Sequence, residues 1–358
     1  MGRYEQYLIA FIEAFAICYI LTPVVRSVAL RFGFVDKPGG RHIHKVPIPL
    51  LGGVAIYLAF ILTSLHRVTM DSDLLGLLAG STVIVMVGII DDIMELPAKL
   101  KFLGQIIAAA IVVLYGIRIE FVTNPFGGMI YLGAWSIPVT LLWIVSITNV
   151  INFVDGLDGL AAGVSSIAAF SLFVVAAEKG QATIALLTIA LAASGVGFLR
   201  YNFNPARIFM GDTGAMFLGF SLATISVIGA LKGATTIALA IPVLALGLPI
   251  LDTAFAIVRR VENGQPFYVA DKGHIHHRLL ALGLTQKQAV LLIYFITSFL
   301  GVSAIVVAQM GILFGYTAVV LIIALLAFGV KRTGIVDTGS HKHVHKVMRN
   351  GGPPAVSV

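Results

Sequence analysis

The chain alternates long apolar runs with short polar segments. A helix that crosses the roughly 30 Å of bilayer hydrocarbon needs about 20 apolar residues. The pattern therefore predicts an all-α, polytopic membrane protein with about eleven transmembrane helices. Their approximate ranges are 7–30, 48–65, 74–90, 101–117, 134–153, 159–177, 181–199, 213–229, 234–257, 288–307 and 311–330.

Composition agrees with this fold class. Of the 358 residues, 58% are hydrophobic and 11% are charged, whereas a soluble domain carries about 25% charged residues. The run 7–30 is too long for a signal peptide and no cleavage site follows it, so we expect it to be retained. With no repeat or boundary visible, residues 1–330 are expected to form one integral membrane domain, and residues 331–358 a polar cytoplasmic tail. The only cysteine, Cys18, leaves the redox compartment undetermined.

The distribution of Lys and Arg predicts the orientation. With the N-terminus outside, 18 of these residues fall in cytoplasmic segments and 5 in outside segments. This bias fits the positive-inside rule. The net charge of +7 is spread over short loops, so no nucleic-acid partner is expected. The same orientation places the four polar clusters described below on the cytoplasmic side, which suggests one shared site.

The first cluster is the pair Asp91 and Asp92 at the end of an apolar run. Carboxylates are costly in hydrocarbon, and adjacent like charges repel unless a cation neutralises them. Lys99 and Lys101 follow, and could offset this charge or hold a phosphate. The plain alternative is a pair of helix-end acids at the membrane interface.

Two further clusters carry carboxylates. On a helix, Asn152, Asp155 and Asp158 would share a face at a spacing of three residues, although a turn with Asx caps is an alternative. Asp212 precedes an apolar run and could be a helix N-cap. That position also suits an anionic ligand, because helix N-termini present backbone N–H groups.

The fourth cluster, residues 274–278, holds three histidines and an arginine. Such a segment could bind zinc or an anion, but the carboxylates elsewhere favour magnesium, which prefers oxygen ligands. We therefore interpret it as a clamp for a diphosphate. Arg41 and His44, in the loop after the first run, could help hold a nucleotide or a lipid phosphate. As a lone feature, that loop is typical of topology-setting basic segments.

In order along the chain, these motifs are DD, NxxDGxDG, NxxPAxxFMGDTG and HxHHR. Together they resemble the polyprenyl-phosphate N-acetylhexosamine-1-phosphate transferases, which include the bacterial enzymes that start teichoic acid, O-antigen and enterobacterial common antigen synthesis. The resemblance covers nearly the whole chain and is strongest to the branch that begins the teichoic acid linkage unit. The HxHHR form resembles the N-acetylglucosamine branch more than the muramoyl-pentapeptide branch.

The resemblance implies roles for individual residues. Asp91 and Asp92 match the paired aspartates, one of which is often assigned as a base, and they are the expected catalytic residues. Asp212 matches the principal magnesium ligand, with Asp92 and Asp155 as further expected ligands. The residues expected to contact substrates are Asn152, Asp158, Asn202, Phe209, His274, His276, His277, Arg278, Lys99, Arg41 and His44.

The implied reaction moves N-acetylglucosamine-1-phosphate from UDP-GlcNAc to undecaprenyl phosphate, with Mg²⁺, or alternatively Mn²⁺, as cofactor. UMP leaves, and the product would begin a cell-wall polymer such as teichoic acid at the cytoplasmic face of a bacterial plasma membrane. UDP-MurNAc-pentapeptide and UDP-GalNAc stay open as other donors. An ion-coupled transporter would also carry intramembrane acids, but here the acids lie at one face. The sequence does not decide between a monomer and a homodimer.

Overall fold

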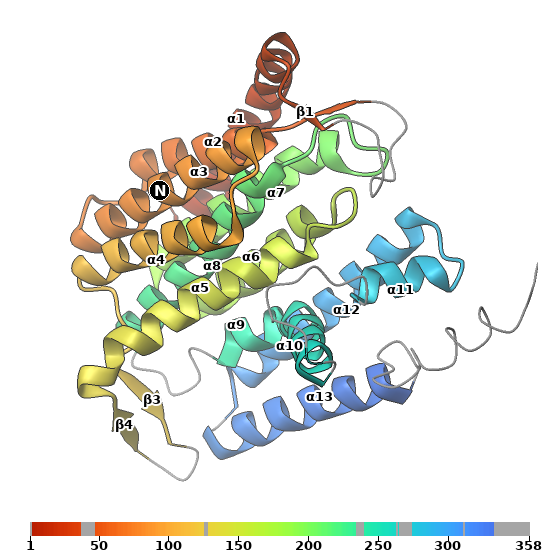
Figure 1. Cartoon of the computed structure of the whole chain (residues 1–358). Helices are drawn as coiled ribbons and strands as arrows, with labels where there is room; N and C mark the ends of the chain where they lie inside the picture. The colour runs from red at the N-terminus through yellow and green to blue at the C-terminus, as the bar shows by residue number, and fades with distance from the viewer. Residues whose placement is uncertain are drawn as a thin grey trace, which may run out of the picture.

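The structure is a computed structural model that describes residues 2–36, 47–124, 128–233, 240–262, 264, 274–310 and 312–332 (Figure 1). Two of the predicted substrate residues, Arg41 and His44, lie outside the described residues. So does the predicted tail beyond residue 332.

The described part of the chain is a bundle of helices with two short antiparallel hairpins. The hairpins pair β1 (Val35–Asp36) with β2 (Ile48–Pro49), and β3 (Phe121–Thr123) with β4 (Met129–Tyr131), and a 3-10 helix, η1 (Gly133–Trp135), follows β4. The α-helices are α1 (Arg3–Phe32), α2 (Gly52–Arg67), α3 (Ser72–Met94), α4 (Ala98–Leu114), α5 (Ser136–Val154), α6 (Leu160–Glu178), α7 (Ala182–Asn202), α8 (Gly211–Gly233), α9 (Ala240–Ala245), α10 (Gly247–Glu262), α11 (Ile275–Ala281), α12 (Gln286–Val307) and α13 (Ile312–Arg332).

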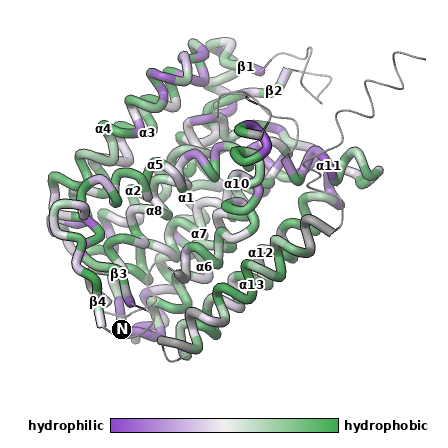
Figure 2. Tube along the Cα trace, turned by 60° about the horizontal axis from the view of Figure 1, so that its bottom comes forward, coloured by the Kyte–Doolittle hydropathy of each residue, from purple (hydrophilic) through white to green (hydrophobic). Residues whose placement is uncertain are grey.

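The predicted all-α, multi-pass membrane class is confirmed. Within the described ranges, seven helices are long and apolar enough to cross a membrane, and they are α1, α3, α5 together with η1, α6, α7, α8 and α12. The number of eleven spans stays a prediction. Hydrophilic residues gather toward two ends of the bundle, one near β1, β2 and α11 and the other near the N-terminus and β4 (Figure 2). The helices between these ends are mainly hydrophobic.

One predicted span differs from the structure. The range 234–257 was expected to be a single helix, whereas its described part contains a short helix, α9, and the start of another, α10. Pro249 lies in the first turn of α10, where its missing N–H is tolerated. A continuous helix would instead set the ring of Pro249 against the carbonyl of Ala245, so the chain breaks between the two helices.

Helix α8 is the centre of the bundle and contacts α2, α3, α5, α6 and α7. Glycines allow the closest approaches. A Cβ on Gly88 of α3 would lie 2.4 Å from Cα of Thr213, and one on Gly53 of α2 would lie 2.1 Å from the backbone N of Gly214. Because backbone atoms cannot rotate away, only glycine fits at these contacts. Both α2 and α3 are thereby held against the first turn of α8.

We expect Gly88→Ala to destabilise the protein by about 1–3 kcal/mol, because an added methyl group would overpack the contact between α3 and α8. Thermal unfolding in detergent would show this as a lowered melting temperature. The matched control is Gly229→Ala, also within a helix, where the nearest atom would be 3.5 Å from the new Cβ. Equal melting temperatures for the two variants would contradict the close packing described here.

Candidate active site

Four of the sequence clusters meet at one end of the bundle. The carboxyl ends of α3 and α5 and the amino ends of α4, α8 and α11 lie there, next to the segments that connect α5 to α6 and α7 to α8. Asp91, Asp155, Asp212 and the histidine segment are therefore close together, although they are far apart in the sequence. This agrees with the expectation of a shared site.

The centre of the site is an ammonium group between two carboxylates. The Nζ atom of Lys101 lies 2.9 Å from Oδ2 of Asp91 and 2.5 Å from Oδ2 of Asp212. The side-chain amide of Asn152 donates to the other carboxylate oxygen of Asp212. Asp212 is therefore held from two sides, by a residue of α4 and a residue of α5.

Of the two lysines that could offset the acidic charge, Lys101 makes the contacts with Asp91 and Asp212, and the predicted contact of Lys99 with substrate stays a prediction. The side chain of Lys99 is exposed, whereas that of Lys101 is only 16% exposed. Because they are two residues apart on a helix, these lysines point to different faces. The sequence contains a signal that tells which of the two faces points inward. Gln105 is a polar residue inside the apolar run, and its spacing of four residues from Lys101 marks the inward polar face.

Asp92 has a different environment from that of its neighbour Asp91. Its carboxylate accepts hydrogen bonds from the backbone N of Asp212 at 2.7 Å, from the backbone N of Thr213 at 3.2 Å and from the Thr213 hydroxyl at 2.6 Å. These N–H groups belong to the first turn of α8, where no carbonyl group of the helix itself is placed to accept from them. Asp92 thus caps α8 from another helix and leaves the Asp212 side chain available to Lys101. This favours a positioning role over the predicted catalytic and metal-binding roles of Asp92.

Asp158 and Asn202 hold the connection between α7 and α8. One oxygen of Asp158 accepts from the Asn204 amide at 2.9 Å and from the backbone N of Ala206 at 3.0 Å. The Asn202 side chain accepts from the backbone N of Gly159 and donates to the carbonyl of Ile208, both at 3.0 Å. Both residues were predicted to contact substrate, and in the structure their polar atoms fix loop geometry.

Phe209 also joins elements through its backbone. Its N–H donates to the carbonyl of Pro49 at 2.8 Å, and its carbonyl accepts from the N–H of Gly52 at 2.9 Å. These bonds connect the start of α2 to the segment that precedes α8. The side chain is half-buried, and its predicted contact with substrate stays a prediction.

Asp155 follows the last residue of α5 and differs from the other acids of the cluster. No hydrogen bond to its carboxylate is found among the described residues. Removal from water raises the pKa of Asp155 to about 8, and the negative charges of Asp212 and Asp92 contribute to the rise. Burial therefore favours the neutral form of this carboxyl group more than it would for an exposed aspartate.

The histidine segment is anchored by Asp252, a residue that the sequence analysis missed. The Asp252 carboxylate lies 2.9 Å from Nδ1 of His274 and accepts from the backbone N of Ile275, also at 2.9 Å. Asp252 is only 6% exposed. The signal was available, because an acidic residue within the predicted span 234–257 is costly unless it has a partner.

His276 packs against the NxxDGxDG motif. Its Nε2 atom would lie 2.3 Å from a Cβ placed on Gly156, so only glycine fits beside it. Burial lowers the pKa of His276 to about 3, and His277 contributes to the decrease. His276 is therefore neutral, which favours hydrogen bonding over the predicted charged clamp. His277 and Arg278 are half-buried in the same segment.

The donor set fits a magnesium ion better than zinc. Among the described residues, no three His, Cys, Asp or Glu side chains are arranged to hold a metal ion by themselves, which argues against a zinc site made only of protein ligands. Magnesium is usually bound by one or two carboxylates, with waters and substrate phosphates completing its coordination. Asp212 and Asp91 are the carboxylates that come together here. In the structure their oxygens are bound by Lys101, by Asn152 and by the backbone N of Leu96, so a metal ion would have to replace some of these bonds.

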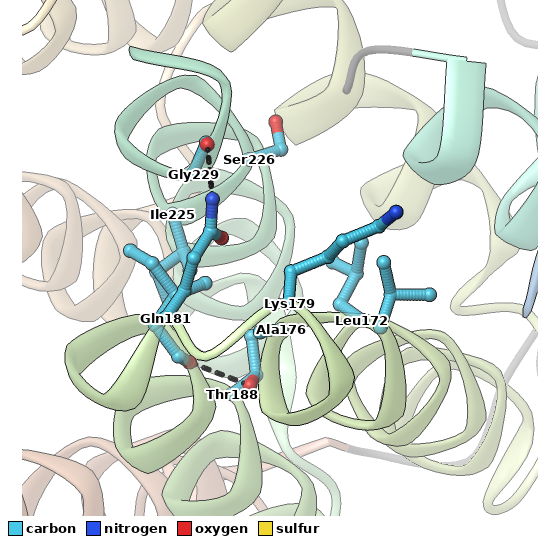
Figure 3. A pocket seen from close by; sticks show the side chains of 10 residues that line it. Leu172, Ala176, Lys179, Gln181, Thr188, Ile225, Ser226 and Gly229 are labelled. Carbon is cyan, nitrogen blue, oxygen red and sulfur yellow. Dashed lines mark hydrogen bonds between the residues drawn. The ribbon is translucent and has the colours of Figure 1, made fainter. Parts of the chain in front are cut away.

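A pocket that is separate from the candidate active site lies between α6, α7 and α8 (Figure 3). Lys179 and Gln181, at the turn that joins α6 to α7, belong to its lining. The candidate active site lies at the opposite ends of α6 and α7, and none of the predicted site residues lines this pocket. We assign it no part in the chemistry.

We expect Asp92→Asn to lower stability by about 0.5–2 kcal/mol, the usual effect of removing a helix cap, because the new NH₂ group would face N–H donors. Thermal unfolding measures this. Glu95→Gln, which changes the charge equally at an exposed position on the same helix end, should leave the melting temperature unchanged. An unchanged melting temperature for Asp92→Asn would return Asp92 to its predicted direct role.

Comparisons with known proteins identify the family. Residues 74–230 match glycosyl transferase family 4. The chain is 40% identical over 337 residues to a "Probable undecaprenyl-phosphate N-acetylglucosaminyl 1-phosphate transferase" of Bacillus subtilis, covering 94% of both chains. It is 37% identical to a "Decaprenyl-phosphate N-acetylglucosaminephosphotransferase" of Mycobacterium tuberculosis (79% of this chain, 78% of the relative). It is 27% identical to an "Undecaprenyl-phosphate alpha-N-acetylglucosaminyl 1-phosphate transferase" of Yersinia pestis (79% of each). The helical membrane fold, the order of the motifs and these similarities show that the chain belongs to glycosyl transferase family 4.

Proposed function

We propose that this protein transfers N-acetylglucosamine-1-phosphate from UDP-GlcNAc to undecaprenyl phosphate, giving undecaprenyl-diphosphate-GlcNAc and UMP. The observation that carries the proposal is the bridge from Asp91 through Lys101 to Asp212 at the polar end of an apolar bundle. The names of relatives in three bacteria support the same reaction type and the same sugar.

The position of the site suits two very different substrates. The donor is a water-soluble nucleotide, whereas the acceptor is a lipid whose phosphate lies at the membrane surface. A site at the end of apolar helices is accessible to both. The distribution of Lys and Arg supports an external N-terminus and a cytoplasmic site, in the plasma membrane of a bacterium, where the product would start a polymer such as teichoic acid.

In the proposed reaction, a bond forms between an oxygen of the acceptor phosphate and the β-phosphorus of the donor. The bond from that phosphorus to the bridging oxygen breaks, and UMP leaves with that oxygen. Both reacting partners are anionic, so their repulsion is a main part of the barrier. A bound Mg²⁺ would neutralise charge on the diphosphate oxygens.

The protein's own residues have separable tasks in this reaction. Lys101 directs two of its three N–H donors to carboxylates, and the third can donate to a phosphate oxygen. Asn152 fixes the orientation of the Asp212 carboxylate by donating to its Oδ1 atom. An acceptor phosphate with a second pKa near 6 is mostly dianionic at neutral pH, so removal of a proton by Asp91 is less important than neutralisation of charge.

The first test is release of UMP by the purified protein. We expect UMP from UDP-GlcNAc only when undecaprenyl phosphate and Mg²⁺ are both present, and we expect EDTA to abolish it. UDP-GalNAc and UDP-MurNAc-pentapeptide serve as competing donors in parallel reactions. Turnover with either of these and none with UDP-GlcNAc would overturn the assignment of the sugar.

The second test compares the two lysines of α4. We expect Lys101→Met to lower kcat/KM for UMP release by about 10²- to 10³-fold, as loss of a preorganised charge-stabilising donor does. Lys99→Met removes the same charge at an exposed position two residues away and should leave the rate near the wild-type value. Similar losses in both variants would indicate a general effect of basic charge and contradict the bridge as the active centre.

A further inference from the structure

A second polar layer lies directly beneath the Lys101–Asp212–Asn152 group. The Asn149 side-chain N–H donates to Oε1 of Gln105 at 2.6 Å, and the Gln105 amide donates back to Oδ1 of Asn149 at 3.3 Å. The Gln105 amide also lies 3.4 Å from the sulfur of Met216. These three residues come from α4, α5 and α8, the same three helices that supply the group above.

The two layers are in register. Gln105 follows Lys101 by four residues, Asn149 precedes Asn152 by three, and Met216 follows Asp212 by four. Residues three or four apart lie on the same face of a helix, one turn from each other. Each member of the lower layer therefore lies one turn deeper in the bundle than a member of the upper layer.

The amide pair is sensitive to sliding of α4 along α5. A shift of one residue moves a helix by about 1.5 Å along its axis, which would break both reciprocal hydrogen bonds. Gln105 is only 1% exposed, so no bulk water can replace them. A buried amide without a partner costs about 1–3 kcal/mol. The pair thus selects a single register of the two helices.

We propose that Gln105 and Asn149 form a positioning pair that sets the distance between Lys101 and Asn152, the two residues that hold Asp212. The inference rests on the proposed transferase function, because it assigns the pair a task in that reaction. The competing explanation is that the pair only satisfies polar groups in an apolar bundle and contributes to stability alone.

Four variants separate these explanations. Gln105→Met and Asn149→Leu each remove the reciprocal amide, so that Asn149 keeps only its bond to the carbonyl of Val145 at 2.8 Å and Gln105 only its contact with Met216. The double variant replaces both amides with apolar groups of similar shape, which can restore stability without restoring the directional bonds. Gln181→Met is the matched control, because it removes an amide that donates to the carbonyl of Gly229 at the other end of the bundle.

Each variant is measured in three ways: melting temperature, kcat and KM for UMP release, and acylation of Lys101 by an amine-reactive ester, quantified by mass spectrometry. Lys179, which is exposed, is the internal reference for acylation. The acylation measurement does not depend on catalysis. It therefore tests the positioning of Lys101 even if the wild-type protein fails to release UMP, a failure that would count against the proposed function alone.

We expect the single variants and the double variant to lose about 10- to 100-fold in kcat, because a misplacement of about 1 Å can cost 10²-fold. KM for UDP-GlcNAc should change little. Acylation of Lys101 should become several-fold faster relative to Lys179, because its ammonium is held less firmly by the two carboxylates. The double variant should regain melting temperature but not kcat. A double variant with wild-type kcat and wild-type acylation of Lys101 would overturn the proposal.

Discussion

The structure depends on neutralising negative charge at the end of an apolar bundle. Asp91 and Asp212 come from different helices, and their approach would be repulsive without the ammonium of Lys101 between them. This bridge joins α3, α4 and α8, and Asn152 adds α5 through the second oxygen of Asp212. A substrate diphosphate and its cation would enter a site in which the balance of charge is already set by these four helices.

The bridge is possible only because the helices approach one another closely. Gly88 lets α3 contact the backbone of Thr213, and Gly53 does the same for α2 at Gly214. This close packing brings Asp92 to the first N–H groups of α8. The adjacent acids of the DD motif therefore divide the work, since Asp92 fixes the start of α8 and Asp91 faces the ammonium group.

Much of the fold followed from hydropathy, because long apolar runs between polar segments have few other solutions in a membrane. Hydropathy failed at 234–257, where the position of a proline divides one run into two helices. The approach of the polar clusters to one end was also predictable from topology. Sequence reasoning did not select Lys101 over Lys99, and it did not pair Asp252 with His274. Both results depend on which face of a helix points inward.

The acids and amides of the motifs differ in which oxygens are already bound. Both oxygens of Asp92 accept hydrogen bonds, and Asp158 and Asn202 hold the loop before α8. The two oxygens of Asp91 and the two oxygens of Asp212 are also bound. These groups can contact a ligand only by giving up bonds that position the site, whereas Asp158 uses only one of its oxygens in the loop. Asp155 has no such partner among the described residues, and burial raises its pKa, with a further contribution from the neighbouring carboxylates. The motif acids therefore divide into those whose oxygens join the helices and loops of the site, and Asp155, whose carboxyl group makes no such bond among the described residues.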